Sequence, residues 1–291
     1  MTTLDMNHLR QWVGRSMTDH DVLSVRHARL MAATVGRAPE SLENGTALPP
    51  LWHWIYFLEG RPPAELGRDG HAARGGFLPP VPLSNRMWAG GQLEFHAPLI
   101  LGQPVEKQSS ILSVEHKQGR SGDLVFVAVE HQIIQCGRQA VREVHDIVYK
   151  TPNLPGAGHT PAEARPSQYS RPFTPDSTML FRYSALTFNG HRIHYDADYC
   201  RNIEGYPNLV IHGPLCATVL AGYAEEVAGR RLKSFVYRAQ RPNLLGDSLS
   251  LNASAHDGAL SIWVAQADGA ISMQAHAGFH DHAHDTATHA S

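Results

Sequence analysis

The pattern that most restricts the fold is a series of strand-length segments in which apolar and polar residues alternate. Between Leu93 and Tyr149 the segments are "QLEFHAPLILG", "VEKQSSILSVEHKQG", "DLVFVAVEHQIIQCG" and "QAVREVHDIVYK", and glycine-containing turns separate them. A period of two residues is typical of antiparallel strands with one buried face. This part of the chain therefore predicts an antiparallel sheet of about four strands.

The order of a helix followed by strands occurs twice. Residues 8–37 predict two helices, with Asp19 or Asp21 as a cap before the second. In the second half, "NLVIHGPLCATVLAGYAEEVAG" predicts an apolar helix closed by Gly229. It precedes "LKSFVYRAQR", "DSLSLNASAHDG", "ALSIWVAQADG" and "ISMQAHAGFH". Since an amphipathic sheet needs a cover, we expect two similar α+β units.

A Pro-rich stretch without periodicity, residues 151–175, separates the two halves and is typical of a linker. We therefore expect an N-terminal domain at residues 1–150 and a C-terminal domain at 176–279. Residues 280–291 carry four histidines but few apolar anchors, which favours a disordered tail over a metal site.

The composition argues against several classes of protein. The chain has 25 basic and 27 acidic residues and no basic run, so we expect no nucleic-acid partner. It contains no stretch of the ~20 apolar residues that cross a membrane and no secretory leader, which favours a soluble, cytoplasmic protein. The widely spaced Cys136, Cys200 and Cys216 form no CxxC pair and are expected to be reduced core thiols.

Three segments resemble a known family. "SALTFNGHRIHYD" and "LVIHGPLCATVL" are similar to the second half of MaoC-like (R)-specific enoyl-CoA hydratases and type 2 hydroxyacyl-thioester dehydratases. "NRMWAGGQLEFHAPLILG" resembles the N-terminal domain of the same family. The resemblance implies an α+β double hot-dog fold, two antiparallel sheets each wrapping a central helix. It also implies that the N-terminal half accommodates substrate and CoA while the C-terminal half carries the catalytic loop.

The resemblance also implies the catalytic residues. The family motif Ser-Gly-Asp-x-Asn-Pro-x-His aligns on His194, an imidazole able to exchange protons at cellular pH. The family's aspartate is replaced by Asn189, which cannot take up a proton, so Asp196 or Tyr183 are weaker candidates for assistance. Gly213, ahead of Pro214 at a helix start, is the expected oxyanion donor. The alternatives are a structural histidine and a plain helix entry.

The substrate expectation depends on charge. "RMWAGG" resembles itaconyl-CoA and mesaconyl-C4-CoA hydratases. Arg86 is the first candidate to bind a substrate carboxylate, because it is expected in a loop with Trp88 and two glycines that could line a pocket, and Arg192 is the second. The other expected substrate-binding residues are Trp88, His191, His212 and Tyr183. The expected reaction is hydration of itaconyl-CoA, by way of mesaconyl-C4-CoA, to citramalyl-CoA.

Other functions stay open. The chain could hydrate mesaconyl-C4-CoA alone, dehydrate a general 3-hydroxyacyl thioester, or bind a thioester without catalysis, because the motif lacks its aspartate. A thioesterase is less favoured, since Glu225 and Glu226 lie far from the helix start. We expect a homodimer or higher homo-oligomer that uses no cofactor and no metal. No phosphate-binding motif identifies the residues that hold the CoA phosphates.

Overall fold

The computed structural model describes residues 4–281 except 74, 84, 120–121 and 152–164. Parts of the predicted linker and tail, residues 152–164 and 282–291, therefore lie outside the described residues. The helices are α1 (Met6–Leu9), α2 (Val25–Thr34), α3 (Ser177–Leu186), α4 (Ala197–Tyr199) and α5 (Gly213–Ala228). The strands are β1 (Ser16–Val22), β2 (Asn85–Phe95), β3 (Pro104–Gly119), β4 (Gly122–Gln135), β5 (Arg138–Lys150), β6 (Tyr169–Phe173), β7 (Leu232–Ala239), β8 (Leu249–His256), β9 (Ala259–Gln266) and β10 (Ile271–Phe279).

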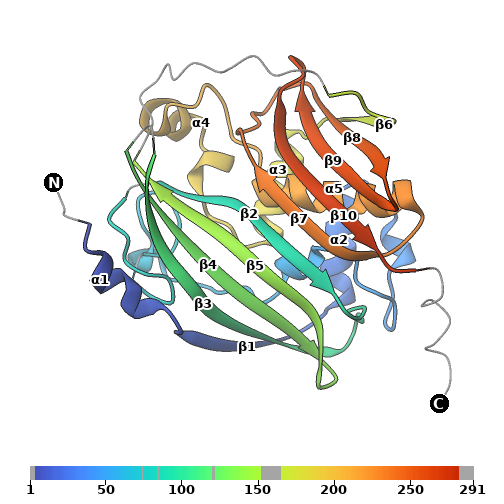
Figure 1. The fold of residues 1–291 in the computed structure, drawn as a ribbon, viewed down its shortest axis with the longest axis horizontal. Coiled ribbons are helices and arrows are strands. Elements are labelled where there is room, and N and C mark those ends of the chain that lie inside the picture. Colours follow the sequence, from blue (N-terminus) through green and yellow to red (C-terminus); the bar gives the residue numbers. More distant parts are fainter. Residues whose placement is uncertain (1–3, 74, 84, 120–121, 152–164, 282–291) are drawn as a thin grey trace.

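The described strands form one antiparallel sheet in the order β1-β3-β4-β5-β2-β7-β10-β9-β8-β6. Figure 1 shows the long strands of the first half beside those of the second half. The two predicted sheets are thus joined edge to edge, because β2 pairs with β7 from Gly90 opposite Arg238 to Glu94 opposite Ser234. The predicted α+β class is confirmed.

The helical prediction for residues 8–37 was partly wrong. Residues 16–22 form β1, which pairs with β3 from Ser16 opposite Ser110 to Val22 opposite Pro104. Its residues are mostly exposed, so they carry no clear alternation of polar and apolar side chains. The following helix, α2, begins after Ser24 rather than at either predicted aspartate cap.

Helix α5 covers the inner face of the second half of the sheet, against strands β7 to β10 (Figure 1). It ends as predicted at Gly229, whose φ of 61° is the left-handed conformation that glycine tolerates. It begins at Gly213, later than the predicted segment, because the preceding residue His212 has a non-helical ψ of 126°. The first half has no helix of comparable length among its described residues; α2 packs against α3 instead.

Strand β2 differs from the prediction in a way that matters for the site. Arg86 and Trp88 were placed in a loop, but both lie on β2. The glycines that suggested a loop serve a close approach between strands. A Cβ at Gly90 would overlap the carbonyl oxygen of Tyr237 on β7.

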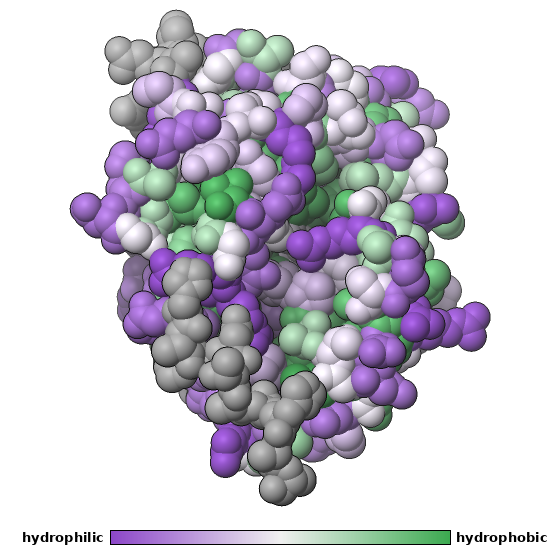
Figure 2. All heavy atoms as spheres, turned by 90° about the vertical axis from the view of Figure 1, so that its right-hand side faces the viewer, coloured by the Kyte–Doolittle hydropathy of each residue, from purple (hydrophilic) through white to green (hydrophobic). Residues whose placement is uncertain are grey.

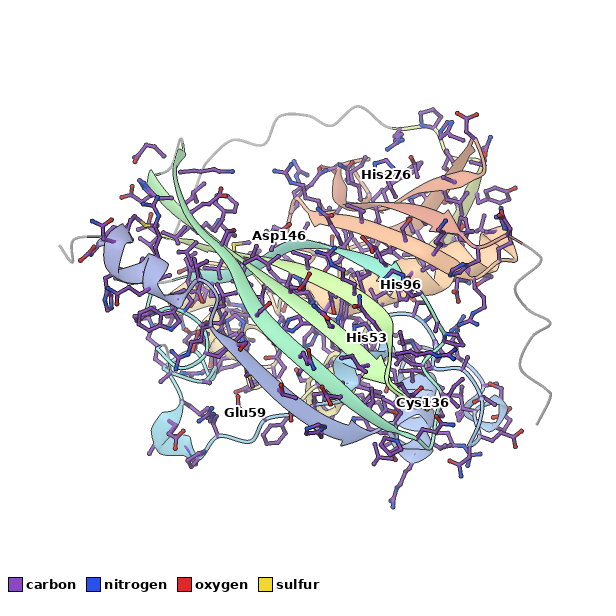
Figure 3. The ribbon with its side chains drawn as sticks, turned by 60° about the horizontal axis from the view of Figure 1, so that its bottom comes forward. His53, Glu59, His96, Cys136, Asp146 and His276 are labelled. Atoms are coloured by element: carbon purple, nitrogen blue, oxygen red, sulfur yellow. The ribbon has the colours of Figure 1, made fainter. Side chains whose placement is uncertain are left out.

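The larger hydrophobic core joins both halves, and a smaller one lies against β3, β4 and β5. Figure 3 shows His53 against the first half of the sheet, while Cys136 lies at the end of strands β4 and β5. All three cysteines are free, but Cys136 is exposed in the β4–β5 turn, which corrects its prediction as a core thiol. On the face in Figure 2, apolar residues form small patches between hydrophilic ones.

Two segments predicted to lie between or after the domains contain residues that pack against the sheet. Strand β6 lies inside the stretch predicted as linker and pairs with β8. His280, predicted in the tail, lies against β2: its Nε2 is 2.8 Å from the carbonyl oxygen of Phe95. Among the described residues, no helix has the length and apolarity required to span a membrane.

Candidate active site

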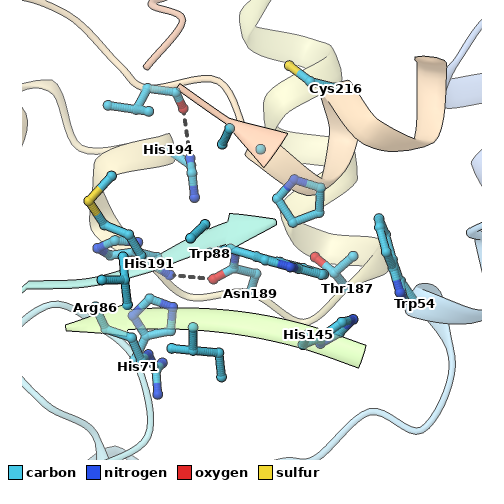
Figure 4. A pocket seen from close by; sticks show the side chains of 18 of the residues that line it. Trp54, His71, Arg86, Trp88, His145, Thr187, Asn189, His191, His194 and Cys216 are labelled. Atoms are coloured by element: carbon cyan, nitrogen blue, oxygen red, sulfur yellow. Dashed lines mark hydrogen bonds between the residues drawn. The ribbon is translucent and has the colours of Figure 1, made fainter. Parts of the chain in front are cut away.

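A cavity of about 1000 Å³ lies between the two halves of the molecule. Its lining comes from β2 and β5 of the first half, from the loop that follows α3, and from the start of α5. Figure 4 shows His194, Asn189, Trp88 and Arg86 around this cavity. The structure therefore brings together residues that are more than a hundred positions apart.

His194 is held as a neutral base. It lies in a short 3₁₀ turn and is only 7% exposed. Its Nδ1 donates to the carbonyl oxygen of Val210 at 2.7 Å, which leaves the lone pair on Nε2. Burial lowers the pKa of His194 to about 4, although the bond to Val210 opposes that shift. The ring thus stays ready to accept a proton across the cellular pH range.

His212 lies behind His194 and takes no part in lining the cavity. The two rings are stacked, with centroids 3.6 Å apart and an interplanar angle of 19°. His212 is fully buried, and its Nε2 is 2.8 Å from Ser184 Oγ. Burial, and next the neighbouring His194, hold the pKa of His212 well below its usual value. The position differs from the expected substrate contact and indicates a support for His194.

Asn189 presents its amide nitrogen to the cavity. Its Oδ1 accepts a hydrogen bond from the backbone N–H of His191 at 3.0 Å. The backbone N–H of Asn189 donates to the carbonyl oxygen of Ser184. Because the side-chain oxygen is occupied, the NH₂ group is the part left to meet a substrate. Asn189 lines the cavity with His191 and His194.

Gly213 lines the same cavity as the first residue of α5, so its N–H has no acceptor within the helix. A Cβ built on Gly213 meets no other atom within 4 Å. A side chain at this position would therefore extend into open space, and the free N–H makes Gly213 a candidate donor to a ligand in the cavity. Pro214 occupies the first turn, as predicted.

The two predicted arginines differ in their surroundings. Arg86 lines the cavity, whereas Arg192 does not. Arg192 donates from Nε and Nη2 to Asp196 Oδ2 at 3.0 and 2.7 Å and lies over the ring of Tyr199. Asp196 also caps α4, so neither residue is available to a substrate in the cavity.

Tyr183 and Trp88 both line the cavity. The Tyr183 hydroxyl is buried without a hydrogen-bond partner among the described residues, and burial raises its pKa, so it remains a donor. The Trp88 ring lies 4.8 Å from Trp54 and 4.4 Å from His145, and its Nε1 donates to Gly90. These aromatic rings narrow the cavity on the side of the first half.

A loop of the first half brings an aspartate and a histidine that the sequence analysis did not select. Asp69 accepts from the backbone N–H of His71 at 3.1 Å, and its Oδ2 lies 3.3 Å from His71 Nδ1. The His71 and His191 rings are 4.2 Å apart. A spacing of Asp-x-His in a glycine-bearing stretch, "RDGHAARGG", is the only signal in the sequence.

The same loop is joined to the catalytic loop through the backbone. Arg192 N–H donates to the carbonyl oxygen of Asp69 at 2.9 Å. Gly70 has a φ of +87°, and a Cβ there would overlap the carbonyl oxygen of Gly190. Only glycine permits this crossing, which fixes His71 beside the catalytic loop.

Asp69, His71 and His191 offer ligand atoms within 4.8 Å of one another, a spacing that could hold a metal ion. No metal was expected from the sequence. Asp69 is the anionic member of this group. Half-burial would raise its pKa, but His71 holds that pKa below its usual range. Burial, and next His71, lower the pKa of His191 to about 3.

A second polar group, also absent from the sequence analysis, lies at the far side of the cavity. Glu143 on β5 is 1% exposed and accepts from His53 Nε2 at 2.9 Å and Trp54 Nε1 at 2.8 Å, and it also bonds with His145 Nε2. Burial would raise the pKa of Glu143, but His145 and His53 hold it well below its usual value. A long apolar acyl chain would meet this group unfavourably.

Comparison with known proteins identifies related sequences. The family model for hydroxyacyl-thioester dehydratase type 2 matches residues 51–244. Mesaconyl-C(4)-CoA hydratase of Chloroflexus aurantiacus is 42% identical over 266 residues, which cover 86% of this chain and 94% of that protein. The mitochondrial hydroxyacyl-thioester dehydratase type 2 of Schizosaccharomyces pombe is 31% identical over 232 residues, covering 71% and 77%.

Solved structures show the same architecture at low sequence identity. A MaoC-like dehydratase from Phytophthora capsici has a TM-score of 0.69 and 12% identity, covering 96% of this chain and 99% of that one. A Mycobacterium tuberculosis protein described as a double hotdog fold has a TM-score of 0.58 and 11% identity, covering 91% and 95%. The predicted double hot-dog fold is confirmed.

Proposed function

The chain belongs to the hydroxyacyl-thioester dehydratase type 2 family, and we propose that it hydrates a short branched dicarboxylic enoyl-CoA, converting mesaconyl-C4-CoA to citramalyl-CoA. As a family member it is a hydro-lyase acting on an acyl thioester. The observation that carries the proposal is the meeting of three groups in one cavity. These are the basic Nε2 of His194, the N–H of Gly213 and the guanidinium of Arg86.

The first step of the proposed reaction is addition of water to the β-carbon of the enoyl thioester. His194 Nε2 takes one proton from the water, and the oxygen of that water forms a bond to the β-carbon. The π electrons move toward the thioester oxygen, where the Gly213 N–H stabilises the developing negative charge. Asn189 orients the thioester or the water through its NH₂ group.

The second step returns the proton. The enolate collapses and its α-carbon takes a proton from the His194 imidazolium, so one water has been added and the base is restored. Asn189 cannot take part in these proton transfers because an amide does not take up a proton. His194 therefore carries both transfers.

We propose itaconyl-CoA as a second substrate that enters through the same intermediate. Its double bond lies out of conjugation with the thioester, between the β-carbon and a methylene group. Removal of an α-proton by His194 gives a dienolate stabilised by Gly213, and protonation of the methylene carbon gives mesaconyl-C4-CoA. Hydration then follows as above.

A panel of CoA thioesters tests the function. The purified protein is incubated with mesaconyl-C4-CoA, itaconyl-CoA and crotonyl-CoA, and products are identified by mass spectrometry. We expect citramalyl-CoA from the first two and slow hydration of the third. Turnover of crotonyl-CoA or a longer 3-hydroxyacyl thioester at the highest rate would favour the general dehydratase. Absence of turnover with all substrates would favour a thioester-binding protein.

The general 3-hydroxyacyl-thioester dehydratase is the second candidate. It is supported by the name of the Schizosaccharomyces pombe relative. The polar group around Glu143 favours a short acyl group instead, because a fatty chain in the same cavity would place apolar surface against a buried charge.

We also propose that the two halves of the molecule have different roles. The first half accommodates the acyl group and CoA, and the second half carries the catalytic loop. We also propose a homodimer or higher homo-oligomer, supported by the two sheet edges that β1 and β6 leave unpaired. Light scattering coupled to size-exclusion chromatography measures the assembly.

A further inference from the structure

We propose that His71, oriented by Asp69, binds the free carboxylate of the substrate together with Arg86. The inference rests on the proposed function and assigns its specificity to two residues that the sequence analysis did not select. It concerns the loop that the first half of the molecule places against the catalytic loop.

The chemistry of the substrate fixes where such a binding group must lie. In mesaconyl-C4-CoA the free carboxylate is attached to the β-carbon, the atom that water attacks. A residue that binds it must therefore lie beside the catalytic base rather than at the far end of the acyl pocket. This excludes the group around Glu143, which is itself anionic and would repel a carboxylate.

The geometry meets this requirement on one side of His194. The His191 ring lies 5.4 Å from the His194 ring, and the His71 ring lies 4.2 Å beyond it. Figure 4 shows His71 and Arg86 next to one another below His191. His71, Arg86 and His191 all line the cavity.

Asp69 acts as a positioning residue. It does not line the cavity but lies behind His71, bonded to the backbone N–H through Oδ1 and close to Nδ1 through Oδ2. Because Nδ1 is directed at Asp69, the ring of His71 is oriented toward the cavity, where a donor beside Arg86 would bind a substrate carboxylate. Charge-assisted hydrogen bonds of this kind are the strong ones.

The connection to the catalytic loop makes the arrangement rigid. The Asp69 carbonyl is bonded to Arg192 N–H, and the backbones cross at Gly70 and Gly190. A carboxylate held by His71 and Arg86 would thus keep a fixed distance from His194. Fixed placement of the β-carbon is what conjugate addition of water requires.

A metal ion on Asp69, His71 and His191 is the competing interpretation. Arg86 lines the cavity next to His71 (Figure 4), so its guanidinium would repel a divalent cation held there. The same charge favours an anion. The observations therefore favour the carboxylate over the cation.

The test compares two thioesters that differ only in the carboxylate. In 3-methylcrotonyl-CoA a methyl group replaces the carboxylate of mesaconyl-C4-CoA. For His71→Gln in the full-length protein, we expect kcat/KM to fall about 10- to 100-fold for mesaconyl-C4-CoA, as for loss of a hydrogen bond to a charged group. The value for 3-methylcrotonyl-CoA should change less than about threefold on the same reasoning.

A second variant keeps the test decisive if His71→Gln folds poorly. Asp69→Asn retains the shape of the side chain, and we expect a rise in KM for mesaconyl-C4-CoA with kcat little changed. His116→Gln is the matched control, because His116 also pairs with an aspartate, Asp123 at 2.7 Å, but lies on the exposed end of β3 away from the cavity. His116→Gln should leave kcat/KM unchanged for both thioesters.

The outcomes separate the inference from the proposed function. Equal losses on both thioesters, or no loss on either, would overturn the role of His71 and leave the hydratase standing. Failure of the unmodified protein to hydrate mesaconyl-C4-CoA would remove both. One equivalent of metal in the purified protein, with activity lost on chelation and restored by that metal, would assign Asp69, His71 and His191 to a metal site instead.

Discussion

The imidazole of His212 lies flat against that of His194, with ring centroids 3.6 Å apart. Two stacked imidazoles cannot both be protonated without strong repulsion, and both are buried. The pair therefore places a neutral base at the cavity and a neutral support behind it. This relationship determines how stability should depend on pH.

We predict that the protein loses stability as the pH falls from about 6.5 toward 4. The pKa values of His194 and His212 are lower in the folded state than the unfolded value of about 6.5, so the unfolded chain binds more protons in this window. Their contribution is present above pH 6.5 and is lost below it, at roughly 1.4 kcal/mol per pH unit and group. Urea unfolding at pH 7, 6 and 5 measures the change.

His212→Asn provides the comparison for this prediction. Removing one buried titrating ring should flatten the pH dependence of the unfolding free energy between pH 7 and 5. Buried His131, whose pKa burial lowers to about 3, adds a background common to both proteins. An unchanged slope in His212→Asn would show that His212 does not contribute.

We predict that His194→Ala folds normally but loses roughly 10²-fold or more in turnover, the effect of losing a general acid and base. Normal folding is expected because the other residues that line the cavity are unchanged. Circular dichroism checks the fold. His256→Ala, at an exposed end of β8, is the control. Turnover close to that of the unmodified protein would exclude His194 from the mechanism.

For Asn189, replacement by alanine and by aspartate should have different effects. Asn189→Ala removes both the NH₂ group in the cavity and the bond that holds His191 N–H, so kcat should fall. Asn189→Asp keeps an oxygen for His191 and adds a group able to move protons, so activity should be preserved or modestly altered. Full kcat in Asn189→Ala would indicate a packing role alone.

The strands were predictable because their pattern is local. The eight predicted strand segments overlap β2 to β5 and β7 to β10, as alternation with a buried face requires, although the first covers only the end of β2. Strand β1 was not predictable, since its exposed polar residues pair with β3 only through tertiary contact. Propensity cannot show such a pairing.

The site divides in a similar way. His194, Asn189 and Gly213 were identified through the resemblance of two short segments to a known family, and the structure places all three on one cavity. Asp69 and His71 depend on the crossing at Gly70 and Gly190, which are 120 positions apart along the chain. Arg192 was the second candidate after Arg86, and only the folded chain shows its bond to Asp196.

We predict that Gly213 cannot be enlarged without loss of catalysis. A Cβ at this position meets no protein atom within 4 Å, so Gly213→Val should not disturb the cavity wall itself. The side chain would instead occupy the approach to the backbone N–H, and loss of an oxyanion donor costs on the order of 10²-fold in rate. Retention of full kcat, measured with mesaconyl-C4-CoA, would move the oxyanion assignment elsewhere.

The preference for carboxylated substrates should depend on Arg86. A carboxylate in a partly dry cavity needs a charged donor, and Arg86 lines that cavity. We predict that Arg86→Gln lowers kcat/KM for mesaconyl-C4-CoA and itaconyl-CoA by about 10- to 100-fold and leaves crotonyl-CoA within a few fold.

Arg192→Gln is the matched control for Arg86→Gln. Its guanidinium is bonded to Asp196 outside the cavity, so the ratio of kcat/KM for mesaconyl-C4-CoA over crotonyl-CoA should stay at that of the unmodified protein. The assay is competition between the two thioesters followed by mass spectrometry. A ratio that collapses in Arg192→Gln but not in Arg86→Gln would reverse the assignment. Equal kcat/KM for both thioesters in the unmodified protein would refute carboxylate recognition by either arginine, because a guanidinium in the cavity favours the anionic substrate over its neutral counterpart.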